Sequence, residues 1–160
     1  MFQLTGEYEC RMDDKGRIKL PAGLIRQLGG SSLPGFVLNR GQERCLSLFT
    51  KTTWDQTTRH INSRLNVYDS KHRAVLRYFY RGATEDNADS ADRILIPKSL
   101  IEYAQLEKDC IVIGYASRIE LWAKNRYEEW LAQEPDDFAS AMDDVKDILA
   151  GIPSGNGPDA

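Results

Sequence analysis

The chain has 160 residues, of which 41% are hydrophobic and 28% charged, and its formal net charge is −3. It has no run of 18 apolar residues and no basic region followed by an apolar core at its N-terminus, which excludes a helical membrane span and a secretory signal. Its three cysteines lie far apart without a C-x-x-C spacing, so we expect free thiols in a reducing cytoplasm.

The charge is distributed unevenly along the chain. Residues 1–83 contain 14 Lys and Arg against 7 Asp and Glu, whereas residues 84–160 contain 7 against 17. A basic half of this kind points to an anionic partner such as nucleic acid. The alternative is a solvated surface whose basic and acidic halves attract each other between subunits.

The first predicted elements are two strands joined by a tight turn. Residues 7–12 alternate polar and apolar side chains, as in a strand with one buried face. Residues 13–16 favour a turn, because aspartate accepts local backbone hydrogen bonds and Gly16 tolerates a positive φ.

The returning strand alternates inward and outward side chains. Its two-residue period directs Ile18 inward and places Arg17 and Lys19 outward. The elements predicted next are a short helix from Pro21 to a stop at Gly29 and Gly30, then strands at 36–39 and 45–49.

Two linking helices are predicted before residue 84. Thr52 and Asp55 have the spacing of a capping box for the first, and Asp69 is placed to cap the second, which runs to about Gly82. The second helix has a basic stripe, Arg73, Arg77 and Arg81. We interpret this stripe as a solvated or subunit-interface surface rather than a DNA-binding one.

The motif at the first turn then occurs again. Residues 13–21 and 89–97 share the pattern D-x-x-x-R-I-x-[LI]-P, and their arginines lie 76 positions apart. The predicted elements that follow also repeat the earlier order: a strand at 93–96, a helix at 97–105, and strands at 110–115 and 119–122. A repeat with this period indicates a duplicated module.

The chain is therefore predicted to have an α+β fold, mainly β, in four segments. They are a first module at 5–53, linking helices at 54–83, a second module at 84–127, and C-terminal helices with a loose acidic tail at 128–160. The helices of the last segment are indicated by a capping box that begins at Asn125, just before it, with Glu128, and by an amphipathic pattern over 138–149.

With these features the chain resembles the MraZ family. The matching residues are Gly6–Tyr8, Asp13–Pro21, Asn39–Gly41, Cys45–Leu46, Arg81–Ala83, Asp89–Pro97 and Ile119–Trp122. The resemblance covers about residues 2–131. It implies two tandem AbrB-like swapped-hairpin β modules that form a pseudo-twofold double-module barrel.

The resemblance also implies a function. Members of this family are DNA-binding transcriptional regulators of their own promoter and of a division and cell-wall gene cluster. They bind short direct repeats in double-stranded DNA as closed rings of many subunits, so we expect a cytoplasmic, nucleoid-associated homo-oligomer.

Arg17 is the predicted main DNA contact. Its planar guanidinium can pair bidentately with guanine O6 and N7 in the major groove, and Asp13 can fix its rotamer across the turn formed with Gly16. Lys15 and Lys19 are better suited to phosphates, which position the protein without specifying sequence. The alternative is a surface ion pair between Asp13 and Arg17, worth about 0–1 kcal/mol.

In the second module, Asp89 and Arg93 repeat this pair, but Asp92 stands where the first module has glycine. Ala91 and Leu95 replace the two lysines. We therefore expect Arg17 to make most of the DNA contacts, and the second module to contribute Arg93 and oligomer contacts.

Catalysis has little support in the sequence. Neither histidine lies in a nucleophile context, and metal-ligand motifs, phosphate loops and dinucleotide fingerprints are absent. We expect no catalytic residues, metal, cofactor, small-molecule substrate or membrane partner. The competing function is an AbrB-like antitoxin or protein-binding scaffold that uses the acidic C-terminal segment, because antitoxin tails often fold on binding.

Overall fold

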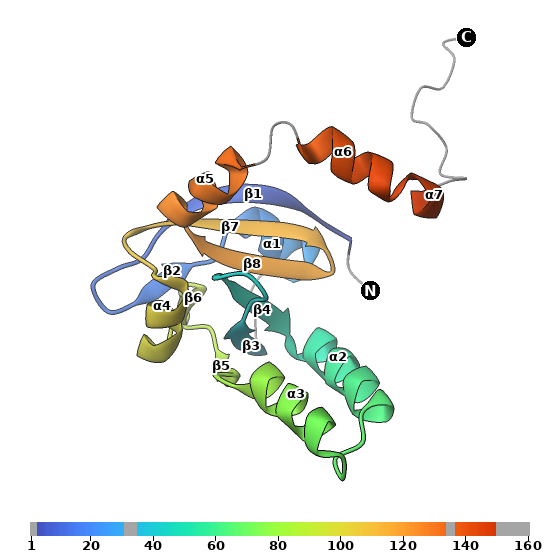
Figure 1. Cartoon of the computed structure of the whole chain (residues 1–160). Coiled ribbons are helices and arrows are strands. Elements are labelled where there is room, and N and C mark those ends of the chain that lie inside the picture. The colour runs from blue at the N-terminus through green and yellow to red at the C-terminus, as the bar shows by residue number, and fades with distance from the viewer. Residues whose placement is uncertain (1–2, 31–34, 134–136, 150–160) are drawn as a thin grey trace. The chain divides into compact units, whose positions relative to one another are not determined.

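The computed structural model describes residues 3–30, 35–133 and 137–149 (Figure 1). These residues form an α+β structure. Its strands are β1 (Leu4–Arg11), β2 (Arg17–Lys19), β3 (Gly35–Arg40), β4 (Leu46–Thr50), β5 (Thr84–Asn87), β6 (Arg93–Leu95), β7 (Asp109–Ala116) and β8 (Arg118–Ala123). Its helices are α1 (Ala22–Gln27), α2 (Lys51–Arg64), α3 (Ser70–Tyr80), α4 (Lys98–Ala104), α5 (Lys124–Ala132), α6 (Asp137–Asp144) and α7 (Lys146–Leu149). The chain divides into two compact units, Met1–Arg126 and Tyr127–Ala160.

The strands of the first unit pair across the two sequence repeats. The larger sheet is antiparallel with the order β1-β7-β8-β4-β3-β5, and β2 pairs with β6 in a separate two-stranded ribbon. If each strand is exchanged with its equivalent in the other repeat (β1 with β5, β3 with β7 and β4 with β8), the result is the same order read from the opposite end. Because β1 pairs with β7 and β3 with β5, neither repeat completes its sheet alone.

The expected closed barrel is not seen in the strand pairing of the described residues. β1 and β5 form the two ends of the six-stranded order, and no ladder joins them. In the part of the chain that the structure describes, one isolated bridge links the ribbon to the residue after β1, between Met12 and Ile18. Four-residue β5 pairs only with β3, which leaves the sheet open on that side.

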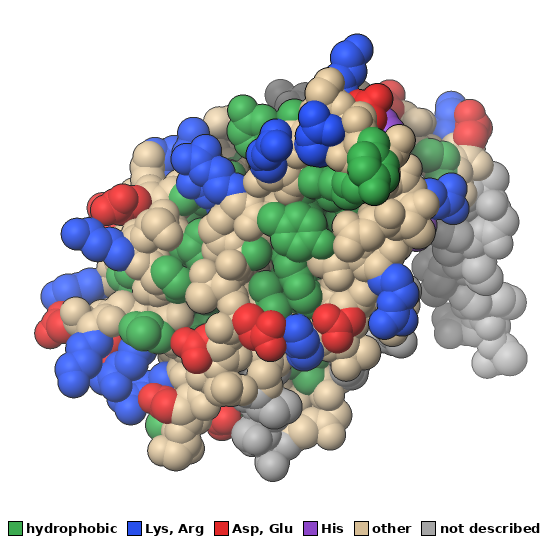
Figure 2. Space-filling model, turned by 90° about the horizontal axis from the view of Figure 1, so that it is seen from below, with side chains coloured by type: hydrophobic (Ala, Val, Ile, Leu, Met, Phe, Trp, Pro, Cys, Tyr) green, Lys and Arg blue, Asp and Glu red, His purple; other side chains and the backbone are tan. Residues whose placement is uncertain are grey.

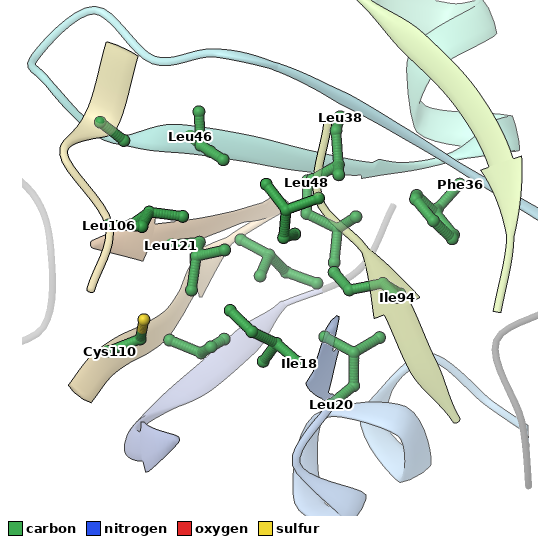
Figure 3. Packing of buried hydrophobic residues seen from close by; sticks show 14 of the residues in the cluster. Ile18, Leu20, Phe36, Leu38, Leu46, Leu48, Ile94, Leu106, Cys110 and Leu121 are labelled. Atoms are coloured by element: carbon green, nitrogen blue, oxygen red, sulfur yellow. The ribbon is translucent and has the colours of Figure 1, made fainter. Parts of the chain in front are cut away.

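The hydrophobic core is built from both repeats. Ile18 and Ile94 oppose each other in the ribbon and are 0% and 1% exposed, so the inward direction predicted for Ile18 is confirmed. Leu38, Leu48 and Leu121 from the larger sheet pack in the same cluster (Figure 3). The inward side chains thus fix which residues of the ribbon face away from the core.

The helix starts differ in part from the prediction. Asp69 caps α3 as expected, accepting hydrogen bonds from the backbone N–H groups of residues 71 and 72. The predicted capping boxes at Thr52 and Asn125 are wrong. Thr50 caps α2, because the chain leaves β4 there in an extended conformation and its hydroxyl accepts from the Thr53 N–H at 3.1 Å. α5 begins at residue 124, so Asn125 already lies inside it.

The second unit also departs from the prediction. The amphipathic pattern over 138–149 forms two short helices, α6 and α7, separated at Val145, instead of one. The side chains of Phe138 and Ile148 are 64% and 82% exposed. The predicted loose tail at 151–160 lies outside the described residues.

Candidate nucleic-acid interface

The first turn is organised by the carboxylate of Asp13. One oxygen accepts the backbone N–H groups of Lys15 and Arg17, both at 2.9 Å. The other oxygen accepts Arg17 Nε at 2.8 Å. Backbone bonds from Asp13 N to Arg17 O and from Gly16 N to Asp13 O close the turn at 2.9 and 3.0 Å. The carboxylate therefore holds both the loop and the guanidinium in one geometry.

The second turn repeats this geometry atom for atom. Asp89 accepts the N–H groups of Ala91 and Arg93 at 2.9 Å each, and Arg93 Nε at 2.8 Å. The matching backbone bonds, Asp89 N to Arg93 O and Asp92 N to Asp89 O, are both 3.0 Å. Two arginine turns with the same hydrogen-bond geometry are thus present in one chain.

The two turns differ at the residue before the arginine. Gly16 has a φ of 77°, and Asp92 takes the same left-handed region with a φ of 58°. Aspartate is one of the few non-glycine residues that enter this region at modest cost. The substitution therefore preserves the backbone of the turn while adding a negative charge beside Arg93.

Hydrogen bonding lowers the pKa of both turn carboxylates. For Asp13 and for Asp89 the largest cause is the backbone N–H of the arginine four residues later, which stabilises the ionised form. Both carboxylates therefore stay charged at neutral pH and keep their arginines paired.

The two turns lie at opposite ends of the β2–β6 ribbon. Arg17 is in register with Leu95, and Lys19 with Arg93. Hydrogen bonds from Leu20 N to Asp92 O, at 3.1 Å, and from Ile96 N to Gly16 O, at 2.9 Å, flank these pairs. By the alternation of an antiparallel ladder, both in-register pairs are non-hydrogen-bonded, which is the arrangement that brings side chains closest.

These four residues form one surface, which we call the ribbon face: Arg17, Lys19, Arg93 and Leu95. They point away from the buried Ile18 and Ile94, since successive side chains alternate between the two sides of a strand. Lys19 is exposed, and Leu95 is 49% exposed. The sequence predicted Lys19 as a phosphate contact of the first module, and the structure places it directly opposite Arg93.

Comparison with known proteins gives the family. The profile of the MraZ family, described as "MraZ protein, putative antitoxin-like", matches twice, at residues 3–78 and 79–147. The chain belongs to the MraZ family. The two matches follow the duplication in the sequence and together span most of the chain.

Individual members of the MraZ family agree with this assignment. A protein of Cytophaga hutchinsonii named "Transcriptional regulator MraZ" is 39% identical over 135 residues, 84% of this chain and 89% of that protein. Proteins of the same name from Treponema pallidum and Halothermothrix orenii are 38% and 39% identical over 144 and 143 residues. These alignments cover 90% and 88% of this chain, and 95% and 96% of the two relatives.

In this MraZ-family chain, both arginines keep hydrogen-bonding capacity for a ligand. Each uses Nε for its aspartate, and among the described residues no hydrogen bond uses the terminal Nη atoms of Arg17 or Arg93. An arginine held through Nε presents its two Nη groups in a fixed fork, which matches a pair of acceptors on a base edge or a phosphate.

Lys15 and Leu95 differ in whether the sequence named them as site residues. Lys15, which it named, is exposed on the first turn, two residues before Arg17. Leu95 was not considered a site residue. The two-residue alternation around Ile94 would have placed it outward, but its position opposite Arg17 depends on a register between segments far apart in sequence.

One other group of ligating side chains exists among the described residues. Ligand atoms of Glu43, Cys45 and Glu120 lie within 4.8 Å of one another. However, burial raises the pKa of the Cys45 thiol to about 12, which disfavours the thiolate that binds metals. The oxygens of Glu120 already accept hydrogen bonds from Tyr115 and Trp122. This cluster is better explained as structural.

The remaining structural features concern the apolar character of the helices and the reactivity of the thiols. No helix in the described ranges is long and apolar enough to cross a membrane. All three cysteines are free, and burial raises the pKa of Cys10 to about 11 and that of Cys110 to about 12. High pKa values make these thiols poor nucleophiles at neutral pH.

Proposed function

We propose that the chain is a sequence-specific, DNA-binding transcriptional regulator that places its ribbon face in the major groove. The observation that supports this most directly is the pair of Asp–Arg turns with matching hydrogen bonds. In each turn the guanidinium is held through Nε, and within the described ranges no hydrogen bond uses its Nη groups. The names of the relatives, transcriptional regulators, agree with this function.

Each residue of the site has a role in this proposal. Arg17 and Arg93 pair with guanine O6 and N7, and each such pair discriminates by about 1–3 kcal/mol. Lys15 and Lys19 bind phosphates. Asp13 and Asp89 orient the arginines, and Gly16 and Asp92 supply the left-handed turn residue. Because Lys19 lies opposite Arg93 and adds a second cation at that end of the ribbon, we assign Arg93 a larger share of the DNA contacts than the sequence alone predicts.

We further propose that the two repeats are AbrB-like swapped-hairpin modules, at 5–53 and 84–127, joined by linking helices at 54–83 and followed by a C-terminal segment at 128–160. The cross-repeat pairing of β1 with β7 and β3 with β5 supports such an exchange of strands. On this basis the chain acts in the cytoplasm, at the nucleoid, on its own promoter and a division and cell-wall gene cluster.

A closed ring of subunits that binds direct repeats completes the proposal. In a ring, the first DNA contact raises the effective concentration of the other subunits at the DNA, so several weak contacts give tight binding. Neighbouring subunits of a ring have the same orientation, which matches direct repeats. The face in Figure 2, over α2 and α3, offers a surface for subunit contacts, because apolar side chains gather there among Lys and Arg. On α3, Val75 and Tyr78 are 56% and 74% exposed, and Arg77 is exposed beside them.

A gel-shift titration on the DNA upstream of the gene tests the function. We expect wild type to bind it more tightly than random DNA, with an affinity that falls steeply with salt. Arg17→Ala and Arg93→Ala should each lose about 1–3 kcal/mol of discrimination. The exposed Arg59→Ala on α2 is the matched control, because it removes the same charge away from the ribbon. Equal binding by all four proteins would contradict the proposal.

An antitoxin-like or scaffold function is the second candidate. The family description and the exposed apolar side chains of the acidic segment α6–α7, such as Phe138 and Met142, favour it. Purification of the chain alone separates the two functions. A stable ring that shifts promoter DNA supports the regulator, whereas a small species that requires a second protein supports the alternative.

A further inference from the structure

The ribbon face contains one apolar side chain among its cations. Leu95 is 49% exposed, lies directly opposite Arg17, and is two residues from Arg93 on the same side of β6. The equivalent position in the first repeat is Lys19. We propose that Leu95 is a specificity residue that contacts the 5-methyl group of a thymine next to the guanine bound by Arg17. This inference rests on the proposed function.

The position of Leu95 determines which part of DNA it can reach. Side chains of a non-hydrogen-bonded pair start from Cα atoms about 4.5 Å apart, so Leu95 and Arg17 extend side by side. When Arg17 reaches the edge of a base, Leu95 faces the adjacent base edge and not the phosphate backbone. The thymine methyl is the apolar group that the major groove presents there, and contact with it is an established mode of base recognition.

The opposite half of the ribbon face has different chemistry. There, Lys19 opposes Arg93, so a strongly hydrated ammonium takes the place of the leucine. This half is suited to a guanine and a phosphate, and the half around Leu95 to a guanine and a thymine.

The difference gives the bound DNA a direction. A ribbon with identical halves would bind DNA equally well in either of two orientations related by its pseudo-twofold axis. Leu95 opposite Arg17, against Lys19 opposite Arg93, removes that equivalence. A directional footprint on each subunit explains why direct repeats, rather than inverted ones, would suit such a protein.

The experiment compares two forms of the promoter fragment, one amplified with dTTP and one with dUTP. The two forms differ only in the 5-methyl groups, which the uracil form lacks. Wild type, Leu95→Ala and Leu95→Lys are titrated on both. Because burying one methyl-sized group is worth about 0.8 kcal/mol, we expect wild type to bind uracil DNA about fourfold more weakly per methyl contacted. Leu95→Ala should bind both DNAs equally and about as weakly as wild type binds uracil DNA.

The controls separate this inference from the function on which it rests. Leu131→Ala removes another exposed leucine, outside the ribbon, and should keep the wild-type preference for thymine DNA. Thermal unfolding verifies that each variant is folded. If wild type binds both DNAs equally, or if Leu95→Ala keeps the preference, the Leu95 contact is wrong and the regulator stands. If wild type itself showed no specific binding to the promoter, both the Leu95 contact and the proposed regulator function would be wrong.

Discussion

Lys19 lies directly opposite Arg93 in a non-hydrogen-bonded pair of the β2–β6 ribbon, so two positive side chains occupy the site where a sheet brings neighbours closest. Like charges in this position destabilise a sheet. Of the Arg93 guanidinium, Asp89 accepts a hydrogen bond from Nε alone. This arrangement costs stability, which is expected where the cations serve an anionic partner.

The first prediction concerns this pair. Lys19→Gln removes one of the two like charges and keeps a long polar side chain, so we expect the free energy of unfolding to rise by about 0.2–1 kcal/mol. DNA affinity should fall. The slope of log affinity against log salt should become shallower by the amount that corresponds to about one lost phosphate contact. Urea unfolding and gel shifts at several salt concentrations measure the two effects. A decrease in stability would contradict the proposed repulsion.

The second prediction contrasts the two left-handed residues. Gly16→Ala should destabilise the fold by about 1–2 kcal/mol, because alanine has no side-chain hydrogen bond to offset a left-handed φ. The added Cβ would also lie 3.2 Å from Ile101 Cδ1. Asp92→Gly should leave stability within about 1 kcal/mol of wild type, since glycine accepts this φ but loses more chain entropy.

Asp92→Gly should also increase DNA affinity at low salt, because it removes a negative charge next to Arg93 in the second turn. Thermal unfolding and gel shifts measure both variants. If Gly16→Ala proved harmless, the left-handed turn could not be a requirement for the arginine geometry.

The third prediction concerns pH. The turn carboxylates have lowered pKa values in the folded chain, so the stability they contribute is present above their unfolded pKa of about 3.9 and is lost as pH falls through the folded values. We expect the free energy of unfolding to decrease below about pH 4. A double variant, Asp13→Asn with Asp89→Asn, should show a smaller decrease.

The control for the pH prediction is Asp14→Asn. Asp14 is exposed beside Asp13, and none of the hydrogen bonds of the described turn uses its carboxylate. Carboxyl-carbon NMR titration gives the pKa values directly. A normal pKa for Asp13 in the folded chain would contradict the hydrogen-bond geometry.

Local features of this chain could be predicted from the sequence because they depend on neighbouring residues. The alternation in 17–20 was sufficient to place Ile18 inward, and Asp69 was recognisable as a cap from its own position. The repeated motif indicated two equivalent arginine turns, and the structure gives them matching hydrogen bonds. These predictions need no knowledge of which strands pair.

The features that were missed depend on contacts between distant segments. Which residue faces Arg17 is set by the β2–β6 register, and each strand of that ribbon has only three residues in which to encode it. The sheet is open because β1 and β5 are its two edge strands and do not pair with each other. The alternation of side chains along a strand does not specify which strands become edges. Lys19 and Leu95 therefore acquire their neighbours only through the fold.

The last prediction follows from the cross-repeat pairing. A fragment of residues 1–83 lacks β7, the partner of β1, and β6, the partner of β2. It also exposes the core face of Ile18, which Ile94 covers in the whole chain. Burying these apolar side chains is the main source of stability, and a fragment of this size can bury little surface alone. We therefore expect neither residues 1–83 nor residues 84–160 to fold as a monomer.

Mixing the two fragments should restore a folded 1:1 complex, because each supplies the strands that the other lacks. Circular dichroism and analytical ultracentrifugation measure structure and stoichiometry for each fragment and for the mixture. A matched control pair, cut instead within the larger sheet between β7 and β8, divides a hairpin whose strands pair with each other from Cys110 to Tyr115 and should reassemble less well. A first fragment that folds alone as a monomer would mean that the repeats are independent domains, which the pairing of β1 with β7 does not allow.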